Sequence, residues 1–339
     1  MPPRVAAIHP IWAIEGGRIT LDGSDFPIDQ PNLPEVRLGE LPARVVYASP
    51  TRISAIVPSG IADSGRTTVR LGTGSGETAF VDLAAPFATG LHQVDNPVFD
   101  RDGNLYVTYS GTRGQQVPVS IFRVRPNGTR EAFSSGIVNP TSTAIGPDGH
   151  LYVSSRFEGT VYRVERDGSV ESFATDLGVA CGLAFASDGT LFVGDRSGTI
   201  FKVDGNGRAT TFASLPGSVA AFHLALGRDE ALYVTGPTLS SYDAIYRVDA
   251  DGTVTSTFRG FGRPQGLAFD SNGALFVVEA LAGSSGLYRM TANGRPELML
   301  SGPGLIGVAF DPHGGVVVCS NETAYRLANA CRPLYVAGA

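Results

Sequence analysis

One pattern of apolar and polar positions occurs six times along the chain. Each copy holds an apolar run, a tight turn, an apolar triplet such as Leu105–Val107, and a third run of apolar-basic-apolar order such as Phe122–Val124. Such alternation is typical of a strand with one solvated face. The turns after the first run are Asp102-Gly103, Asp148-Gly149, Asp188-Gly189, Asp229-Glu230, Asn272-Gly273 and His313-Gly314.

A second turn follows the third run in five of the copies, as at Asn127-Gly128, and it decays to Asn329-Ala330 in the last. Asn-Gly and Asp-Gly supply the positive φ angles that tight hairpins need. Each copy is therefore predicted to be four antiparallel strands, and successive copies start 40 to 46 residues apart. This period predicts propeller blades, and six copies predict an all-β fold with a six-bladed β-propeller. A β-sandwich would explain neither the period nor the paired turns.

The first part of the chain lacks this period. Its short alternating runs, separated by Gly and Pro turns, predict a small β-sandwich over residues 1–84, followed by the propeller over 85–339. Phe87-Ala88-Thr89 has the pattern of a fourth blade strand, like Phe173-Ala174-Thr175. It competes with residues 332–336 for the outer place in the last blade, and in either case we expect the two domains to be joined tightly.

Composition and charge narrow the function. The formal net charge of −6 and the lack of a Lys/Arg cluster argue against nucleic-acid and membrane partners. No signal-peptide pattern and no long apolar segment is visible, so a cytoplasmic location is expected, although a trimmed secreted form would read the same. The three cysteines show no CxxC spacing, and no GxSxG, GxxxxGK[ST] or HExxH pattern occurs, so no nucleotide cofactor is expected.

Candidate chemistry gathers where the first strand of each blade starts and the second strand ends. Both lie at one mouth of a propeller channel, together with the loop between the second and third strands. That loop is longest in the first repeat, from Tyr109, and should overhang the mouth. The candidates are Glu279, His223 and Asp195 as catalytic residues; Arg156, Arg196, Tyr109, Gln265 and Asn321 as substrate-binding residues; and Asp95 and Asn96 as metal ligands.

Two of these candidates carry the hypothesis of catalysis. Glu279 ends a strand of Leu, Phe and Val, where a buried unpaired carboxylate would cost several kcal/mol, so we expect it to face water or ligand. His223 stands where other blades have a glycine, and its bulk needs open space. Either could act as a general base, with Arg156 and Arg196 holding an anionic substrate or an oxyanion.

Structural roles remain open for each candidate. Asp195 could cap a turn, His223 could be a core histidine, and the two arginines could pair with nearby acids. Trp12 is expected to be a core residue of the first domain rather than a contact residue.

The repeated pattern P-x-G-L-A-F-D-x-x-G-x-L-[YF]-V resembles the NHL-repeat and gluconolactonase-like propellers over roughly residues 91–339. This resemblance implies a small-molecule hydrolase of the lactonase or esterase kind, with a divalent cation, usually Ca²⁺, near the mouth. Related propellers include lyases and non-enzymatic binding scaffolds, and both remain open. The family's ligand places are held here by Asp95, Thr141, Cys181, Phe222, Gln265 and Ile306. Only Asp95 and Gln265 offer strong oxygen donors, so a metal-free route also stays open.

The first domain carries a second resemblance. The order I-x-P, Gly16-Gly17, T-L-x-G-x-x-F and V-R-L-G is similar to the immunoglobulin-like IPT/TIG domain, apart from Trp12-Ala13, where that family often has a glycine. The resemblance implies a module that packs on the propeller or mediates dimerisation.

Overall fold

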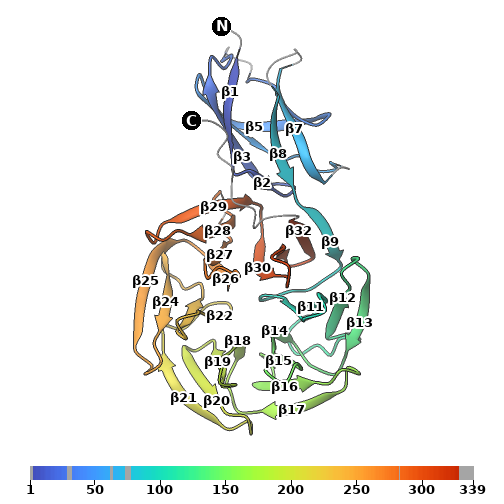
Figure 1. Cartoon of the computed structure of the whole chain (residues 1–339), viewed down its shortest axis with the longest axis vertical. Coiled ribbons are helices and arrows are strands. Elements are labelled where there is room, and N and C mark those ends of the chain that lie inside the picture. Colours follow the sequence, from blue (N-terminus) through green and yellow to red (C-terminus); the bar gives the residue numbers. More distant parts are fainter. Residues whose placement is uncertain (1–2, 29–32, 62–63, 73–77, 282, 328–339) are drawn as a thin grey trace.

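The computed structural model describes residues 3–28, 33–61, 64–72, 78–281 and 283–327. Every regular element in these ranges is a β-strand, so they contain no helix that could span a membrane. Figure 1 shows a small domain, drawn in blue, above a ring of sheets. The fold is all-β, as predicted.

The N-terminal domain folds around one apolar core. Ile19, Leu21, Val36, Leu38 and Ile53 are fully buried in it. The long strand β5 pairs with β6 on one side of this core and with β4 on the other, which joins the two faces of the sandwich. The strands are β1 (Arg4–His9), β2 (Trp12–Ala13), β3 (Arg18–Ser24), β4 (Val36–Leu38), β5 (Leu41–Ser49), β6 (Arg52–Ile56), β7 (Gly65–Leu71) and β8 (Ala79–Leu83).

The ring contains five separate sheets of four antiparallel strands. Four of them are β10 (Val98–Phe99) to β13 (Arg130–Ser134), β14 (Pro140–Ile145) to β17 (Val170–Ala174), β18 (Ala180–Phe185) to β21 (Ala209–Ser214), and β22 (His223–Leu226) to β25 (Val254–Phe261). Their middle strands are β11 (Leu105–Thr108), β12 (Ile121–Val124), β15 (Leu151–Ser155), β16 (Thr160–Val164), β19 (Leu191–Asp195), β20 (Thr199–Val203), β23 (Leu232–Thr235) and β24 (Asp243–Val248). The fifth sheet is β30 (Leu305–Phe310), β31 (Val316–Ser320), β32 (Thr323–Leu327) and β9 (Ala85–Thr89).

The expectation of six separate blades needs a correction at the remaining repeat. Its strands, β26 (Pro264–Phe269), β27 (Leu275–Glu279), β28 (Gly286–Met290) and β29 (Pro296–Ser301), end a twelve-stranded sheet that continues into the N-terminal domain. The cause is β2, which pairs in parallel with β29 on one side and with β8 on the other. Five blades therefore stand alone, while the fifth repeat is fused to the first domain.

Apolar triplets form the second strand of each repeat because these strands are buried on both faces. All five residues of β27 are buried, as are all four of β11. A strand covered on both sides reads as a continuous apolar run. The third strands keep one partly exposed face, which explains their basic residues, such as Arg289 in β28.

The two domains are joined at two neighbouring places. Trp12 is 8% exposed and packs in the cluster of Leu300 and Val278, so it is a core residue, but of the propeller side. The strand β9 pairs with β32 and takes the outer place in the last blade. The rival for that place, residues 332–336, lies outside the described residues. Strand pairing therefore links the two domains at both places.

Candidate functional site

A cavity of 520 Å³ opens at the end of the ring where the first strands begin. It is lined by Val94, Arg113, Asn139, Arg156, Phe157, Gly178, Val179, Cys181, Arg196, Val219, Ala220, Ala221, Gln265 and Ile306. Cys181, Gln265 and Ile306 come from the starts of first strands, and Arg156 and Arg196 directly follow second strands. The predicted meeting of these two kinds of position at one mouth is therefore present in the structure.

The cavity has two unlike sides. Arg113, Arg156 and Arg196 follow β11, β15 and β19, which belong to three successive blades. The other side, before and within β22, β26 and β30, contributes Val219, Ala220, Ala221, Gln265 and Ile306. None of the lining residues is an acid, so the cavity is cationic on one side and uncharged on the other.

The guanidinium groups of the three arginines have no ion pair or hydrogen bond within the described part of the chain. Burial lowers the pKa of Arg156, and the charge of Arg196 lowers it further. The two guanidinium groups are thus close enough to repel each other, and an anion between them would relieve that repulsion. The expected pairing of Arg156 and Arg196 with Asp195 or Glu279 does not occur.

Arg113 belongs to the long loop that was expected to overhang the mouth. The buried side chain of Asn139 fixes that loop with three hydrogen bonds: Nδ2 donates to the carbonyls of Ser110 and Thr112, each at 2.7 Å, and Oδ1 accepts from N of Gly114 at 2.6 Å. The ring of Phe157 packs against Gly114 from the other side. Arg113 is therefore delivered to the cavity by a loop that is held at both ends.

A histidine and an aspartate meet at the centre of the ring. His223 starts β22 and Asp95 precedes β10, strands that lie on opposite sides of the ring in Figure 1. Nδ1 of His223 hydrogen-bonds Oδ1 of Asp95, and both residues are almost wholly buried. Asp95 is itself fixed, because Gln93 Nε2 donates to its carbonyl at 2.6 Å and its Oδ1 accepts from N of Asn96 at 2.7 Å.

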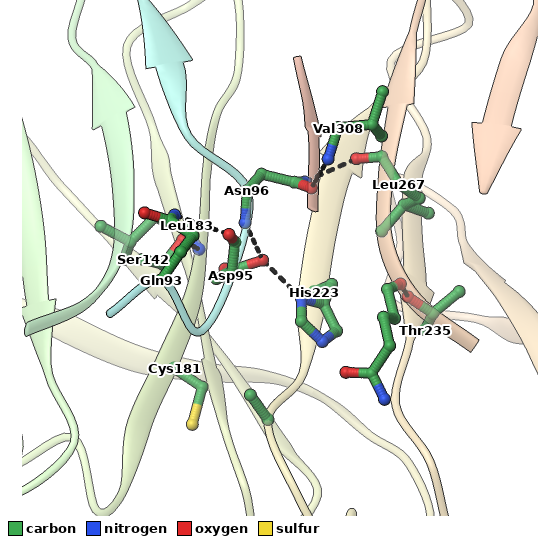
Figure 2. A network of polar contacts seen from close by, with 12 residues as sticks. Gln93, Asp95, Asn96, Ser142, Cys181, Leu183, His223, Thr235, Leu267 and Val308 are labelled. Atoms are coloured by element: carbon green, nitrogen blue, oxygen red, sulfur yellow. Dashed lines mark hydrogen bonds and ion pairs between the residues drawn. The ribbon is translucent and has the colours of Figure 1, made fainter. Parts of the chain in front are cut away.

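The second ring nitrogen, Nε2 of His223, is buried and has no hydrogen-bond partner among the residues that the structure describes. When an ionised Asp95 accepts from Nδ1–H, Nε2 of the neutral imidazole carries the lone pair. In Figure 2 this edge of the ring points to the same side of the network as the thiol of Cys181, a cavity residue. An unpaired buried polar atom costs about 1–3 kcal/mol, which makes this nitrogen the strongest chemical signal at the centre of the ring.

Asn96 is a tie between blades. Its Nδ2 donates to the carbonyl of Leu267 at 2.8 Å, and its Oδ1 accepts from N of Val308 at 2.9 Å, as Figure 2 shows. A Cβ at Gly266 would lie 2.1 Å from Asn96 Oδ1, and one at Gly307 would lie 2.6 Å from the Asp95 carbonyl. Glycine is needed at both places because this segment approaches the two inner strands so closely.

The predicted calcium site does not fit these donors. Both ends of the Asn96 amide are used by backbone groups, and Asp95 is held by His223 and by N of Asn96. Over the described ranges, no group of three or more His, Cys, Asp or Glu side chains converges. Calcium prefers six to eight oxygen ligands, so we derive no step through a metal.

Cys181 lies in the cavity as a neutral thiol. Burial raises its pKa to about 12, and the nearby Asp95 adds to this effect. Its Sγ donates to the carbonyl of Val179 at 3.2 Å. A thiol with such a pKa is a poor nucleophile at neutral pH, so Cys181 shapes the cavity rather than attacking a substrate.

Glu279 does not lie in the cavity, which corrects its assignment as a catalytic residue. It is 2% exposed, and its carboxylate accepts from N of Gly262 at 2.7 Å, Arg263 at 2.9 Å and Leu281 at 2.6 Å. Burial raises its pKa, and these backbone donors act in the opposite direction. A strand of Leu, Phe and Val can end on this acid because the surrounding loops supply its hydrogen bonds.

Three other predicted site residues also contact neighbouring protein groups and do not line the cavity. Asp195 accepts from N of Val179 at 2.8 Å and from the hydroxyl of Ser197, so its alternative as a loop cap is the one observed. Asn321 donates to the carbonyl of Gln93 at 3.1 Å. Tyr109 packs edge-on against His92 and Phe122. None of the three lines the cavity.

The sequence reasoning missed Arg113, Asn139 and Phe157 as site residues. The length of the first loop was the available signal for Arg113. Asn139 directly precedes a first strand and is followed by proline, a position that offered no chemical signal until its three loop partners were seen.

The comparisons with known proteins give different information about the two domains. Residues 3–81 match the family model of the IPT/TIG domain. No curated protein matches the chain at a significant level. The family match covers the first domain only, so the propeller is compared through solved structures.

Three similar structures illustrate the range of functions on this fold. An auxiliary nutrient binding protein from Bacteroides ovatus has 15% identity and a TM-score of 0.55, covering 97% of this chain and 98% of its own. A gluconolactonase from Xanthomonas campestris has 14% identity and a TM-score of 0.57, covering 71% and 87%. A catalytically inactive histidine-to-alanine variant of virginiamycin B lyase from Staphylococcus aureus, with quinupristin, has 16% identity and a TM-score of 0.52, covering 87% and 99%. At such identities the likeness shows the fold alone.

Proposed function

We propose that this chain is an enzyme acting on a small anionic molecule, with a hydrolase of the lactonase or esterase kind as its first assignment. We count the fused unit β26–β29 as a sixth blade of the gluconolactonase-like, NHL-type ring. The observation that carries the proposal is the buried pair of Asp95 and His223. Neither residue lines the arginine-rich cavity, but Nε2 of His223 has no hydrogen-bond partner in the described ranges and points to the same side as the cavity residue Cys181 (Figure 2).

His223 acts as the general base in this proposal. Its Nε2 takes a proton from a water molecule while the water oxygen bonds to the carbonyl carbon of the ester or lactone. The tetrahedral intermediate then breaks its bond to the leaving oxygen, which takes the proton back from Nε2. Asp95 is a positioning residue: it fixes the tautomer of His223 and stabilises the transient imidazolium, as in serine hydrolase triads.

Arg156 and Gln265 stabilise the oxyanion in this proposal. Both line the cavity, and no hydrogen bond of the Gln265 amide group appears among the described residues, so this amide is available to the oxyanion. A positioned donor of this kind contributes on the order of a hundredfold or more to the rate.

A lyase is the second candidate, and the shielding of Nε2 favours it. Where water has little access, the base can remove a proton from a carbon atom of the substrate, and the electron pair of that C–H bond expels the leaving group. The virginiamycin B lyase variant that lost its activity through replacement of a histidine supports this alternative.

A binding protein is the third candidate. The Bacteroides ovatus nutrient binding protein supports it, because the likeness extends over both domains. In this alternative the same cavity binds the same anions without turnover. Dimerisation through the first domain, a cytoplasmic location and a bound calcium ion remain predictions.

The deciding experiment is a panel of lactones, esters and substrates with an acidic C–H next to a carboxylate, each assayed with calcium and with chelator. The wild-type protein is compared with His223→Gln and with His313→Gln, a control at an exposed turn. Turnover that disappears in the first variant alone supports the proposal. Turnover that survives in His223→Gln contradicts it, and binding without any turnover supports the third candidate.

A further inference from the structure

The cavity's distribution of charge points to its ligand class. We infer that the ligand is an organic dianion: an uncharged, partly apolar body that carries two negative charges at one end, as a dicarboxylate or a phosphate monoester does. The inference deepens the proposed function and rests on it for the site, although it concerns binding and not turnover.

The first step is the number of cations without partners. Three guanidinium groups line one cavity, and the described residues offer them no acid. Elsewhere on the propeller, arginines with acids nearby use them, as Arg163 does with Asp148 and Glu165 and Arg247 does with Asp229. The three arginines of the cavity differ from these, because they have no acidic partner among the described residues. A planar guanidinium group matches carboxylate or phosphate oxygens, so an anionic ligand could take the place of that partner.

The second step is the repulsion between two of them. Burial and the charge of Arg196 both lower the pKa of Arg156, which is only partly exposed. Arg113 and Arg196 are exposed while Arg156 is partly buried, and neutralising one charge would still leave two cations at the same cavity. A ligand with two charges at one end compensates this set better than a monoanion.

The third step is the fixed position of Arg113. Asn139 spends all three of its hydrogen bonds on the loop of Ser110, Thr112 and Gly114, which brings a third cation to the rim. A loop that served only to cover the mouth would not need such a fixed start. Arg113 is therefore a specificity residue for the second negative charge.

The fourth step concerns the body of the ligand. The side opposite the arginines is uncharged, with Val219, Ala220, Ala221 and Ile306 around the amide of Gln265. Phe157 and Val219 are large apolar residues at the mouth that are 53% and 45% exposed. This side suits an aliphatic or aromatic body with one carbonyl or hydroxyl group for Gln265.

The test uses four probes that share one aromatic ring and differ in charge. Phenyl phosphate and phthalate are dianions, benzoate is a monoanion, and benzyl alcohol is neutral. Calorimetric titrations of the wild-type protein should show both dianions binding at least about tenfold more tightly than benzoate, and benzyl alcohol most weakly. Arg113→Gln should weaken the dianions by about tenfold and leave benzoate within about twofold. The control Arg166→Gln, an exposed arginine in a turn at the other end of the ring, should change nothing.

Several outcomes would overturn the inference: dianions that bind no better than benzoate, dianions that fail to bind at millimolar concentration, or an Arg113→Gln variant with unchanged affinities. Preference for phenyl phosphate or for phthalate distinguishes the two kinds of dianion. His223→Gln separates this inference from the proposed function. If it binds dianions normally while the wild-type protein turns nothing over, the ligand class stands and the enzyme proposal fails. If neutral esters are turned over and dianions do not compete, the reverse holds.

Discussion

Two buried carboxylates lie near the same end of the ring and have opposite surroundings. Glu279, at the end of β27, is surrounded by three backbone N–H groups of its own blade. Asp95, in the segment before β10, hydrogen-bonds an imidazole from the far side of the ring, and the other nitrogen of that imidazole has no partner. The hydrogen bonds of Glu279 are supplied by the protein itself, whereas the pair of Asp95 and His223 leaves one ring nitrogen available to a ligand.

The difference shows how to separate holding residues from site residues in this fold. Asp195, Asn321 and Asn96 follow the pattern of Glu279, because their polar atoms are spent on nearby backbone groups. His223 and the three arginines follow the other pattern. The candidate site is therefore marked by polar side-chain atoms that have no hydrogen-bond partner among the described residues, and not by polarity or burial alone.

The largest expected effect tests the two carboxylates against each other in turnover. Asp95→Asn should lower kcat by about a hundredfold to ten-thousandfold, because the amide can stabilise the wrong tautomer of His223. Glu279→Gln should leave kcat within a few-fold. Steady-state kinetics with a pH profile checks this, since a positioning role predicts that the acidic limb, which follows protonation of the general base, changes in Asp95→Asn. Equal losses in both variants would erase the distinction.

The next effect reverses the comparison in stability. Glu279→Ala leaves three N–H groups of two loops without their acceptor, and we expect a loss of about 2–4 kcal/mol in the free energy of unfolding. Urea denaturation followed by fluorescence measures it, with Glu322→Ala, an exposed acid, as control. A Glu279→Ala protein as stable as the control would show that the loop finds other partners.

A smaller effect concerns the loop that carries Arg113. Asn139→Ala should weaken dianion binding by about tenfold, because the loop loses its three hydrogen bonds and Arg113 its position. Since both residues act through one contact, the double variant with Arg113→Gln should bind no more weakly than either single variant. Additive losses in calorimetry would mean that Asn139 contributes independently of Arg113.

The last prediction concerns Cys181, the thiol in the cavity, for which we expect the smallest effect on ligand binding and turnover. With its pKa raised to about 12, alkylation by iodoacetamide at pH 8 should be about a thousandfold slower than for a free thiol. The sign for stability follows from the same shift: the folded state keeps a proton that the unfolded state loses, so stability should fall as pH rises through the interval from 9 to 12. Mass spectrometry of the native protein measures the rate of alkylation, and rapid labelling of Cys181 would contradict the prediction.

The architecture could be predicted because it depends on local, repeated signals. The Asp-Gly and Asn-Gly turns and the apolar triplets fix each four-stranded unit, so the repeats were placed without long-range information. The fusion of β26–β29 to the first domain was missed, because it depends on the short strand β2 at Trp12 and Ala13, whose two partners lie far away in the sequence. A two-residue strand carries no period.

The candidate site was predicted in part. The starts of first strands and the ends of second strands do surround one cavity, and Arg156, Arg196 and Gln265 line it. Glu279 was misread because sequence shows that a carboxylate ends a strand, but not that the backbone of two loops turns towards it. The pairing of Asp95 with His223 could not be predicted either, since it crosses the ring between repeats that are not neighbours in the chain.

The strand β9 has a consequence for how the chain matures on the ribosome. It precedes the blades in the sequence, yet its partner β32 follows the strands of all the other blades, so its pairing edge must wait until those strands have been synthesised. An open strand edge invites pairing with other molecules, and a nascent chain that stalls would present one. Closure of the ring therefore depends on the last described blade being present.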